Sequence, residues 1–368
     1  MPSILPNFVC FYRRQAGKAE QFTAFLLCRR FLRHINLLKR RYFFMEMRII
    51  DTHCDTMGEC IARSGGKITL QNNPGHINME KLRQGGALAE FFAIFIPTYD
   101  SGAGKGVTLP PYDYFQFVYQ AYLRELEANQ DQLAPAMNGA DIRKNQAAGK
   151  ISSVLTVEDG VPLEGKMERL EEFYQKGVRL ISFTWNYENS LGFPNSKDPE
   201  IMDKGLKQFG LDCVERMNQL GMLIDVSHLS DGGFWDIVRH SKKPFIASHS
   251  CCRALCNHTR NLTDEMLRAL GEKGGVVGIN FAAQFLNEGA EYTDIDSVVR
   301  HMRHIRDKAG MDALGFGSDF DGISSTLEFQ DYAGMPQILQ ALSPHFTENE
   351  IEKICSGNML RLIDETLK

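Results

Sequence analysis

The chain lacks long apolar runs, paired cysteine motifs and low-complexity stretches, and each absence excludes a class of protein. No window approaches the roughly 18 apolar residues that a transmembrane helix needs. The nine Cys show no Cys-x-x-Cys spacing, which indicates reduced thiols in a cytoplasmic protein rather than a disulfide framework. With 43% hydrophobic and 24% charged residues, the composition is typical of a soluble globular protein.

Positive charge is scarce in most of the chain and concentrated at its start. Residues 1–44 hold nine Lys or Arg and one acid, whereas the remaining residues hold 32 Lys or Arg against 45 Asp or Glu. An acidic body without a basic stripe gives no reason to expect nucleic acid as a partner. We therefore divide the chain into a basic N-terminal extension, residues 1–46, and a body, residues 47–368.

The extension allows two interpretations. The first is that Met45 or Met47 is the native start, so that the preceding residues are not part of the protein. The second is a basic amphipathic helix with a membrane-surface or targeting role, because apolar residues between Phe22 and Leu38 fall near helical spacing. We expect no stable membrane anchor, since residues 363–368 are charged and do not resemble a lipid-anchor signal.

From Met47 onward, short apolar runs of β type alternate with stretches of helical period. The expected strands are residues 49–51, 88–96, 151–157, 178–183, 222–226, 244–247, 274–279 and 313–316. The clearest expected helices are residues 112–129, 206–220, 234–240, 263–270, 295–308 and 348–367. Eight strands alternating with helices predict an α/β fold with a parallel sheet, and a (β/α)₈ barrel is the architecture that fits best.

Side chains of the metal-ligand type recur just after these strands. His53 and Asp55 follow the first strand two residues apart, so an extended chain places both on one face. The others are Glu158, His228, His249 and Asp319. Each alone has an ordinary structural explanation, such as a hydrogen-bonded His or a helix cap. In a barrel, however, all of them lie at the C-terminal face, where such enzymes build their sites.

The residue types indicate a metal centre. Three imidazoles and two or three carboxylates suit Zn²⁺ or a similar divalent ion. Five ligands exceed the three protein ligands of one catalytic zinc, and a two-metal centre with a bridging carboxylate accounts for the surplus. We interpret Glu158 as that bridge.

Several motifs together resemble the membrane (renal) dipeptidase family of zinc dipeptidases, and in particular a soluble, bacterial-type member. The motifs are Asp51-Thr-His-Cys-Asp55, Glu158-Asp-Gly160, Asp225-Val-Ser-His228, Ser248-His249-Ser250, Asn257-His-Thr-Arg260-Asn261, Gly317-Ser-Asp-Phe-Asp-Gly322 and Ser356-Gly-Asn-Met-Leu-Arg361. The resemblance covers residues 47–368 in order. It implies a distorted (β/α)₈, TIM-like barrel of the metal-dependent hydrolase type.

The resemblance also implies two Zn²⁺ ions and their ligands. His53 and Asp55 are expected to bind one zinc, His228 and His249 the other, and Glu158 both. The implied reaction is hydrolysis of the peptide bond of dipeptides with a free C-terminal carboxylate, through a metal-bridging hydroxide.

Three further residues have implied roles at the substrate. Arg260 is expected to hold the dipeptide's carboxylate, which suits the fork geometry of a guanidinium. Asp319 is expected to serve the bridging water and the substrate amine, which makes Asp319 and Glu158 the expected catalytic residues. Trp185 stands where animal members of the family have a substrate-facing His. It cannot act as acid or base, although its indole N–H can donate a hydrogen bond to substrate.

Two other functions remain open from the sequence. The first is an amide, lactam or ester hydrolase that uses the same dinuclear centre. The second is a barrel that binds metal or a small molecule without catalysis, although the presence of all five expected metal ligands and of Asp319 argues against it. The sequence does not define which side chains of a dipeptide are preferred, which metal is native, or the oligomeric state. A homodimer is one possible state.

Overall fold

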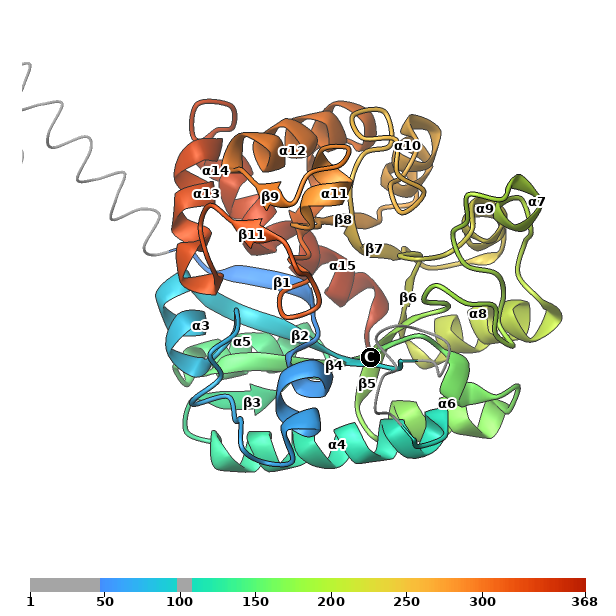
Figure 1. Ribbon diagram of the computed structural model, residues 1–368, viewed down its shortest axis with the longest axis horizontal. Coiled ribbons are helices and arrows are strands. Elements are labelled where there is room, and N and C mark those ends of the chain that lie inside the picture. The colour runs from blue at the N-terminus through green and yellow to red at the C-terminus, as the bar shows by residue number, and fades with distance from the viewer. Residues whose placement is uncertain (1–46, 98–107) are drawn as a thin grey trace, which may run out of the picture. The chain divides into compact units, whose positions relative to one another are not determined.

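Eight parallel strands form a closed barrel in the computed structural model, which describes residues 47–97 and 108–368 (Figure 1). The strands of the ring are β1 (Ile49–Cys54), β2 (Ala87–Phe95), β4 (Ile151–Glu158), β5 (Val178–Ser182), β6 (Leu223–Asp225), β7 (Ile246–Ser250), β8 (Val276–Ile279) and β10 (Leu314–Phe316). Each pairs with the next in that order, and β10 pairs with β1 to close the ring. The predicted TIM-like (β/α)₈ barrel is therefore confirmed.

Three short strands lie outside the ring. β3 (Leu133–Pro135) pairs with the first residues of β4. β9 (Tyr292–Thr293) and β11 (Thr326–Leu327) form a separate two-stranded parallel pair. These strands are not predicted from the sequence, because segments of two or three residues are too short to show an alternation of apolar and polar side chains.

Helices lie between and around the strands (Figure 1). They are α3 (Met79–Gly85), α4 (Pro111–Ala128), α5 (Gly139–Ala147), α6 (Met167–Gln175), α7 (Pro199–Met202), α8 (Gln208–Leu220), α9 (Asp231–His240), α10 (Asp264–Glu272), α11 (Ala283–Leu286), α12 (Ile295–Ala309), α13 (Met335–Leu342), α14 (Glu348–Glu352) and α15 (Asn358–Thr366). Their ends follow local chemistry. Thr263 caps α10 by accepting the Met266 N–H, and Gly221 ends α8 at φ +78°.

An apolar cluster seals the end of the barrel at which the strands begin. It combines residues near the strand starts with the inner face of α15, namely Ile50, Leu180, Leu223, Ile246, Val276, Met359, Leu362 and Ile363. Burying each large aliphatic side chain of this kind stabilises the fold by about 1.5–3 kcal/mol. His53, Glu158 and His249 lie toward the opposite, C-terminal end of their strands.

Two expected strands differ from the observed ones at the residues that matter for function. The expected strands 49–51 and 244–247 end before His53 and His249, whereas β1 continues to Cys54 and β7 runs to Ser250. Both histidines therefore lie inside strands and inherit the rigidity of the sheet. The expected helix 348–367 is also interrupted, since a π-helical turn at Lys353–Gly357 separates α14 from α15.

The prediction for residues 1–46 lies outside the described residues. Among residues 47–97 and 108–368, no helix has both the length and the hydropathy required to cross a membrane.

Candidate metal centre

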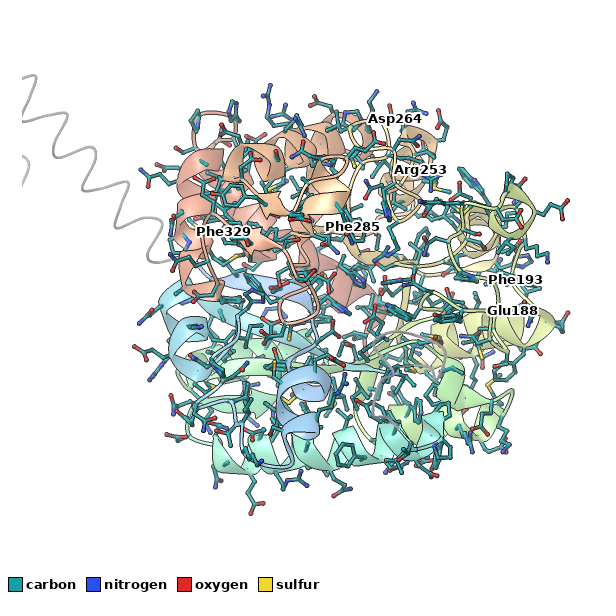
Figure 2. The ribbon with its side chains drawn as sticks, in the orientation of Figure 1. Glu188, Phe193, Arg253, Asp264, Phe285 and Phe329 are labelled. Carbon is teal, nitrogen blue, oxygen red and sulfur yellow. The ribbon has the colours of Figure 1, made fainter. Side chains whose placement is uncertain are left out.

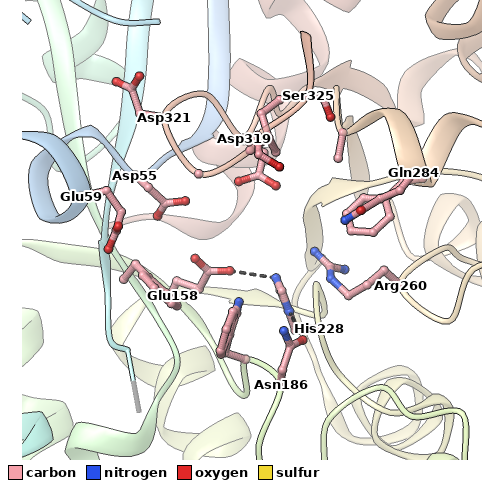
Figure 3. A pocket seen from close by; sticks show the side chains of 17 residues that line it. Asp55, Glu59, Glu158, Asn186, His228, Arg260, Gln284, Asp319, Asp321 and Ser325 are labelled. Atoms are coloured by element: carbon pink, nitrogen blue, oxygen red, sulfur yellow. Dashed lines mark hydrogen bonds and ion pairs between the residues drawn. The ribbon is translucent and has the colours of Figure 1, made fainter. Parts of the chain in front are cut away.

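The ligand-type side chains come from different strands and meet at the C-terminal end of the barrel. His53 lies on β1, Glu158 is the last residue of β4, and His249 lies on β7. His228 and Asp319 each follow a strand by three residues, β6 and β10 respectively. Glu158, His228 and Asp319 line a cavity of about 250 Å³, together with Asp55, and Figure 3 shows these side chains pointing into it.

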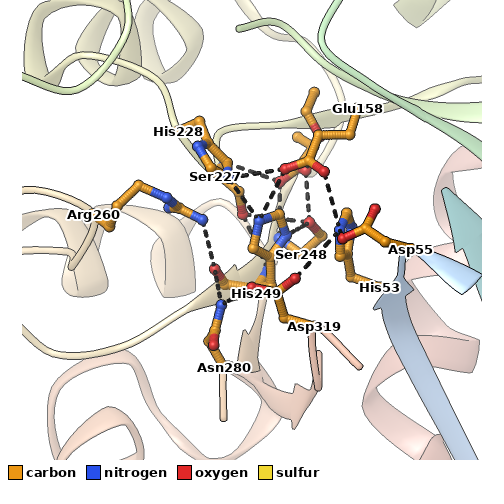
Figure 4. A network of polar contacts seen from close by, with 12 residues as sticks. His53, Asp55, Glu158, Ser227, His228, Ser248, His249, Arg260, Asn280 and Asp319 are labelled. Carbon is orange, nitrogen blue, oxygen red and sulfur yellow. Dashed lines mark hydrogen bonds and ion pairs between the residues drawn. The ribbon is translucent and has the colours of Figure 1, made fainter. Parts of the chain in front are cut away.

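Glu158 is the centre of this arrangement (Figure 4). Its Oε2 lies 3.3 Å from Nε2 of His53. Its Oε1 lies 2.9 Å from Nε2 of His228 and 3.4 Å from Nε2 of His249. One carboxylate thus directs its two oxygens to two different sets of imidazoles, as a bridging ligand must.

The second group of ligand atoms surrounds His53. Nε2 of His53 lies 3.6 Å from Asp55 Oδ2 and 3.9 Å from Asp319 Oδ1. The ligand atoms of His53, Asp55 and Asp319 all lie within 4.8 Å of one another, and so do those of His53, Glu158 and His249. His53 belongs to both groups, so the geometry brings the expected ligands together without dividing them into the two expected pairs.

Hydrogen bonds on the far side of two imidazoles determine which atoms face the cavity. Nδ1 of His228 lies 3.0 Å from Asn186 Oδ1, and Nδ1 of His249 lies 2.7 Å from Ser248 Oγ. The amide oxygen of Asn186 can only accept, so His228 carries its proton on Nδ1.

The two Nε2 atoms face each other at 3.0 Å, beside Oε1 of Glu158. Because His228 carries its proton on Nδ1, the lone pair of its Nε2 converges with the Glu158 carboxylate beside Nε2 of His249, and a cation is the partner that such a set fits.

Burial and neighbouring charges hold these groups in the protonation states of metal ligands. Burial lowers the pKa of His228 to about 4 and holds the pKa of His249 well below its usual range, so both imidazoles are neutral. Burial acts to raise the pKa of Glu158, but the charge of His53 and the hydrogen bonds of the other imidazoles outweigh it, and the pKa is well below its usual range.

His53 differs from the other two imidazoles. Burial acts to lower its pKa, but Glu158 and Asp55 outweigh that effect and raise it well above its usual range. Protons and metal ions compete for such an imidazole, because a ligating His must be neutral.

The loop after β10 brings Asp319 close to Asp55. Asp319 and Asp321 both have left-handed backbones, at φ +61° and +64°. A Cβ on Gly322 would lie 2.0 Å from Oδ2 of Asp55, so only glycine allows this approach. Thr56 Oγ1 donates to Asp321 Oδ2 at 2.7 Å and thereby holds this loop against the segment that follows β1.

Arg260 reaches the same cavity from the connection after β7. Arg253 lies on the same connection (Figure 2) and forms a bidentate ion pair with Asp231 at 2.6 and 2.8 Å. Arg253 also donates to backbone carbonyls next to Arg260, which holds this part of the connection in place. The Arg260 side chain is buried, 5% exposed, with Nη2 donating to the His249 carbonyl at 3.3 Å. Its Nε has no hydrogen-bond partner among the described residues. A buried guanidinium with an unused donor is a site for an anion.

Trp185 forms part of the cavity wall. Its ring packs edge-to-face against Phe95, with centroids 4.9 Å apart, and lies 6.1 Å from the ring of His228. Trp185 is therefore part of the cavity lining.

Two asparagines support the site and were not predicted from the sequence. Asn186 holds His228, and Asn280 donates to Asp319 Oδ2 at 2.9 Å. Both follow an expected strand within a few residues, which is the signal that identified the other site residues. An amide is a poor metal ligand compared with His and carboxylates, so neither asparagine was among the ligand-type side chains considered in the sequence.

The family model described as membrane dipeptidase, peptidase family M19, matches residues 39–368 of the chain. The chain is 30% identical over 305 residues to dipeptidase tcpJ of Claviceps purpurea, which covers 79% of this chain and 69% of that protein.

Solved structures give the same result. The crystal structure of the dipeptidase AC, a metallopeptidase of family M19, superposes with a TM-score of 0.79 at 27% identity and covers 88% of this chain and 99% of that chain. A metallopeptidase from Rhodobacter sphaeroides, solved with a phosphinate mimic of the dipeptide L-Ala-D-Ala, gives a TM-score of 0.78 at 26% identity and covers 87% of this chain and 99% of that chain.

Proposed function

The chain belongs to the membrane dipeptidase family, and from this premise we propose that it hydrolyses dipeptides with a free C-terminal carboxylate in a reaction that depends on two zinc ions. That it is a metallo-dipeptidase follows from the family and from the metallopeptidase structures it resembles. The number and kind of metal ions, and the part of the dipeptide that is recognised, are our proposal.

The donor set supports two ions held by five residues. We assign His53 and Asp55 to one ion, His228 and His249 to the other, and Glu158 to both, because the two oxygens of Glu158 face different imidazoles. When bound, such ions lower the pKa of water so that hydroxide is available near neutral pH, and they polarise the carbonyl of the peptide bond.

The observation that carries the dipeptide assignment is the buried, unsatisfied guanidinium of Arg260. It lines the same cavity as Glu158 and Asp319, and its Nε lacks a partner in the part of the chain that the structure describes. A carboxylate is the anion that matches its fork, and a dipeptide's free C-terminus lies one residue from the peptide bond to be cleaved. The cavity volume, about 250 Å³, suits a substrate of this size.

Asp319 is placed to handle protons at the cavity. Asn280 holds its Oδ2, while Oδ1 is directed toward His53. Burial raises the pKa of this carboxyl, which brings it closer to the range in which a group can both take and return a proton. We assign Asp319 to accept the proton of the attacking water and to pass it to the leaving amine. Trp185 closes the cavity wall and offers its indole N–H to the substrate.

The described cysteines support a cytoplasmic location, the setting that the sequence predicts. All seven are free thiols, and five of them are completely or almost completely shielded from solvent: Cys54, Cys213, Cys251, Cys252 and Cys355. Such thiols persist where the compartment is reducing.

The test combines metal analysis with a substrate panel. Purified protein should contain two zinc ions per chain, lose hydrolysis of dipeptides on chelation and regain it on addition of zinc. Dipeptides should be cleaved far faster than cyclic dipeptides, lactams or lactones. A metal-loaded protein that cleaves lactams or lactones but no dipeptide would be a different hydrolase, and one that binds dipeptides without cleaving any would be a binding protein.

A further inference from the structure

A chain of buried hydrogen bonds runs from Asp225 through Ser248 to His249. Asp225 is the last residue of β6, and Ser248 and His249 are neighbours on β7. Ser248 Oγ lies 2.6 Å from Asp225 Oδ2. It also lies 2.7 Å from Nδ1 of His249, and Figure 4 shows Ser248 and His249 together. All three residues are 0% exposed, so water does not compete for these contacts.

The donors around Asp225 determine where each proton lies. Oδ1 accepts the backbone N–H groups of Ser227 and Ser248 at 3.0 and 2.8 Å, and Oδ2 accepts the hydroxyls of Ser182 and Ser248 at 2.5 and 2.6 Å. The single proton of the Ser248 hydroxyl is therefore directed to Asp225. Its oxygen must then accept at the 2.7 Å contact with His249, which requires a proton on Nδ1 of the imidazole.

A proton on Nδ1 leaves the lone pair of His249 on Nε2, the atom that faces Glu158 and the cavity. We propose that Asp225, acting through Ser248, is a positioning residue that holds His249 in its metal-binding tautomer. The inference rests on the metal-binding role proposed above for His249. It adds two residues, Asp225 and Ser248, that do not touch the metal but decide whether a ligand is ready for it.

The other imidazole assigned to the same metal is held differently. His228 donates from Nδ1 to the amide oxygen of Asn186, which is neutral and exposed to solvent. The partner behind His249 is instead a buried carboxylate that acts through a hydroxyl. A buried anion both orients the ring and increases its basicity as a ligand, so the Asp225 chain should contribute more to metal retention than Asn186 does.

Asp225→Asn tests the direction in which the hydrogen bonds between Asp225, Ser248 and His249 are donated, not only whether these bonds exist. The amide oxygen would accept the two backbone N–H groups, so the amide nitrogen would face the hydroxyls of Ser182 and Ser248. Ser248 would then accept from Asn and donate to Nδ1 of His249, which moves the ring proton to Nε2, against the metal. The same Asp to Asn exchange in a Ser-His-Asp triad produces the wrong His tautomer.

The experiment measures zinc affinity of the full-length, zinc-loaded protein by competition with a chelator of known affinity. Ser248→Ala should weaken binding by about 10- to 100-fold, the usual effect of removing a group behind a ligating His. Asp225→Asn should weaken it more than Ser248→Ala. In the double variant, Asp225→Asn should add little, because no hydroxyl remains to present a proton to His249.

Ser182→Ala is the matched control. It removes a hydroxyl that donates to the same carboxylate oxygen at the same depth but does not touch His249, so its zinc affinity should stay within about threefold of wild type. Thermal unfolding of each variant in chelator reports general damage to the fold separately from metal affinity. If Asp225→Asn does not fold, the comparison of Ser248→Ala with Ser182→Ala still decides.

Two results would overturn the inference. One is a Ser248→Ala protein that retains zinc as well as Ser182→Ala does. The other is a double variant in which the separate losses of Asp225→Asn and Ser248→Ala multiply, since independent effects exclude a single chain of proton positions. No substrate enters the measurement. A protein that binds zinc as expected but cleaves no dipeptide would contradict the proposed function and leave this inference intact.

Discussion

Removing the guanidinium of Arg260 should abolish the preference for substrates with a free carboxylate. The side chain is 5% exposed, and its Nε has no partner among residues 47–97 and 108–368, so little solvent screens a carboxylate bound to it. At about 4 Å and an effective dielectric constant of about 20, two opposite charges attract by about 4 kcal/mol. Desolvation of the substrate carboxylate offsets part of this energy, and losing one partner of such a pair typically costs about 2–4 kcal/mol.

This energy corresponds to a fall of about 30- to 1,000-fold in kcat/KM for Arg260→Ala. The assay compares each dipeptide with its C-terminal amide, which has the same shape but no charge. Wild type should prefer the acid strongly, and Arg260→Ala should lose most of that preference while it keeps the metal content of wild type. The metal content is the internal control, because the guanidinium also contacts the carbonyl of His249.

An Arg260→Ala protein that prefers the acid over the amide by the same factor as wild type would refute this role of Arg260. In that case another cation holds the carboxylate, and the unsatisfied Nε of Arg260 has a different role. Equal loss on acid and amide would likewise indicate damage to the cavity, not loss of a charge pair.

Two further predictions rest on the structure, and a third rests on the different charge and pattern of residues 1–46 in the sequence. Glu158→Ala should lose metal and most hydrolysis, because two oxygens that face different imidazoles disappear together; an active variant with two metals per chain would contradict the bridging role. Glu90 is completely buried, and its burial, together with the smaller effect of the Asp51 charge, raises the pKa of this carboxyl well above its usual range. The stabilising contribution of the protonated group to folding is therefore present at low pH and is lost as pH rises toward the folded-state pKa. Glu90→Gln should therefore gain in unfolding temperature relative to wild type between pH 5 and pH 8, and a difference that does not change with pH would refute this. A chain that starts at Met47 should fold and hydrolyse dipeptides as the full chain does, and insolubility or inactivity of the shorter chain alone would make residues 1–46 part of the fold.

The alternation of strands and helices could be read from the sequence because it depends on local pattern. All eight ring strands overlap the expected ranges, since each is a run of buried β-type residues. Among the helices that were missed, α5 has a weak local signal, because Ile142 is its only large apolar side chain that is buried. Its helical state depends on packing against the barrel. Helix α6, in contrast, has an apolar face that includes Leu170 and Phe173, so its pattern was present in the sequence and was overlooked.

The identity of the candidate ligands was equally accessible from the sequence. In a parallel barrel every strand ends at the same face, so ligand-type residues at strand ends must converge whatever the details of packing. That rule predicted that His53, Glu158, His228, His249 and Asp319 meet at one end of the barrel, and the structure places them close together there. It could not separate the residues into two metal sites, because it contains no distances.

What only the tertiary structure decided is the state of each side chain. The proton on His249 depends on Asp225 and Ser248, which lie on neighbouring strands, β6 and β7, and meet only when the sheet has formed. The unpaired Nε of Arg260 also depends on the tertiary structure, because no described residue accepts a hydrogen bond from it in the folded chain. Sequence pattern determines which groups point to one end of the barrel, because strand direction and side-chain alternation are local. Hydrogen-bond partners, burial and protonation are properties of the assembled barrel, because each requires contacts between residues far apart in the chain.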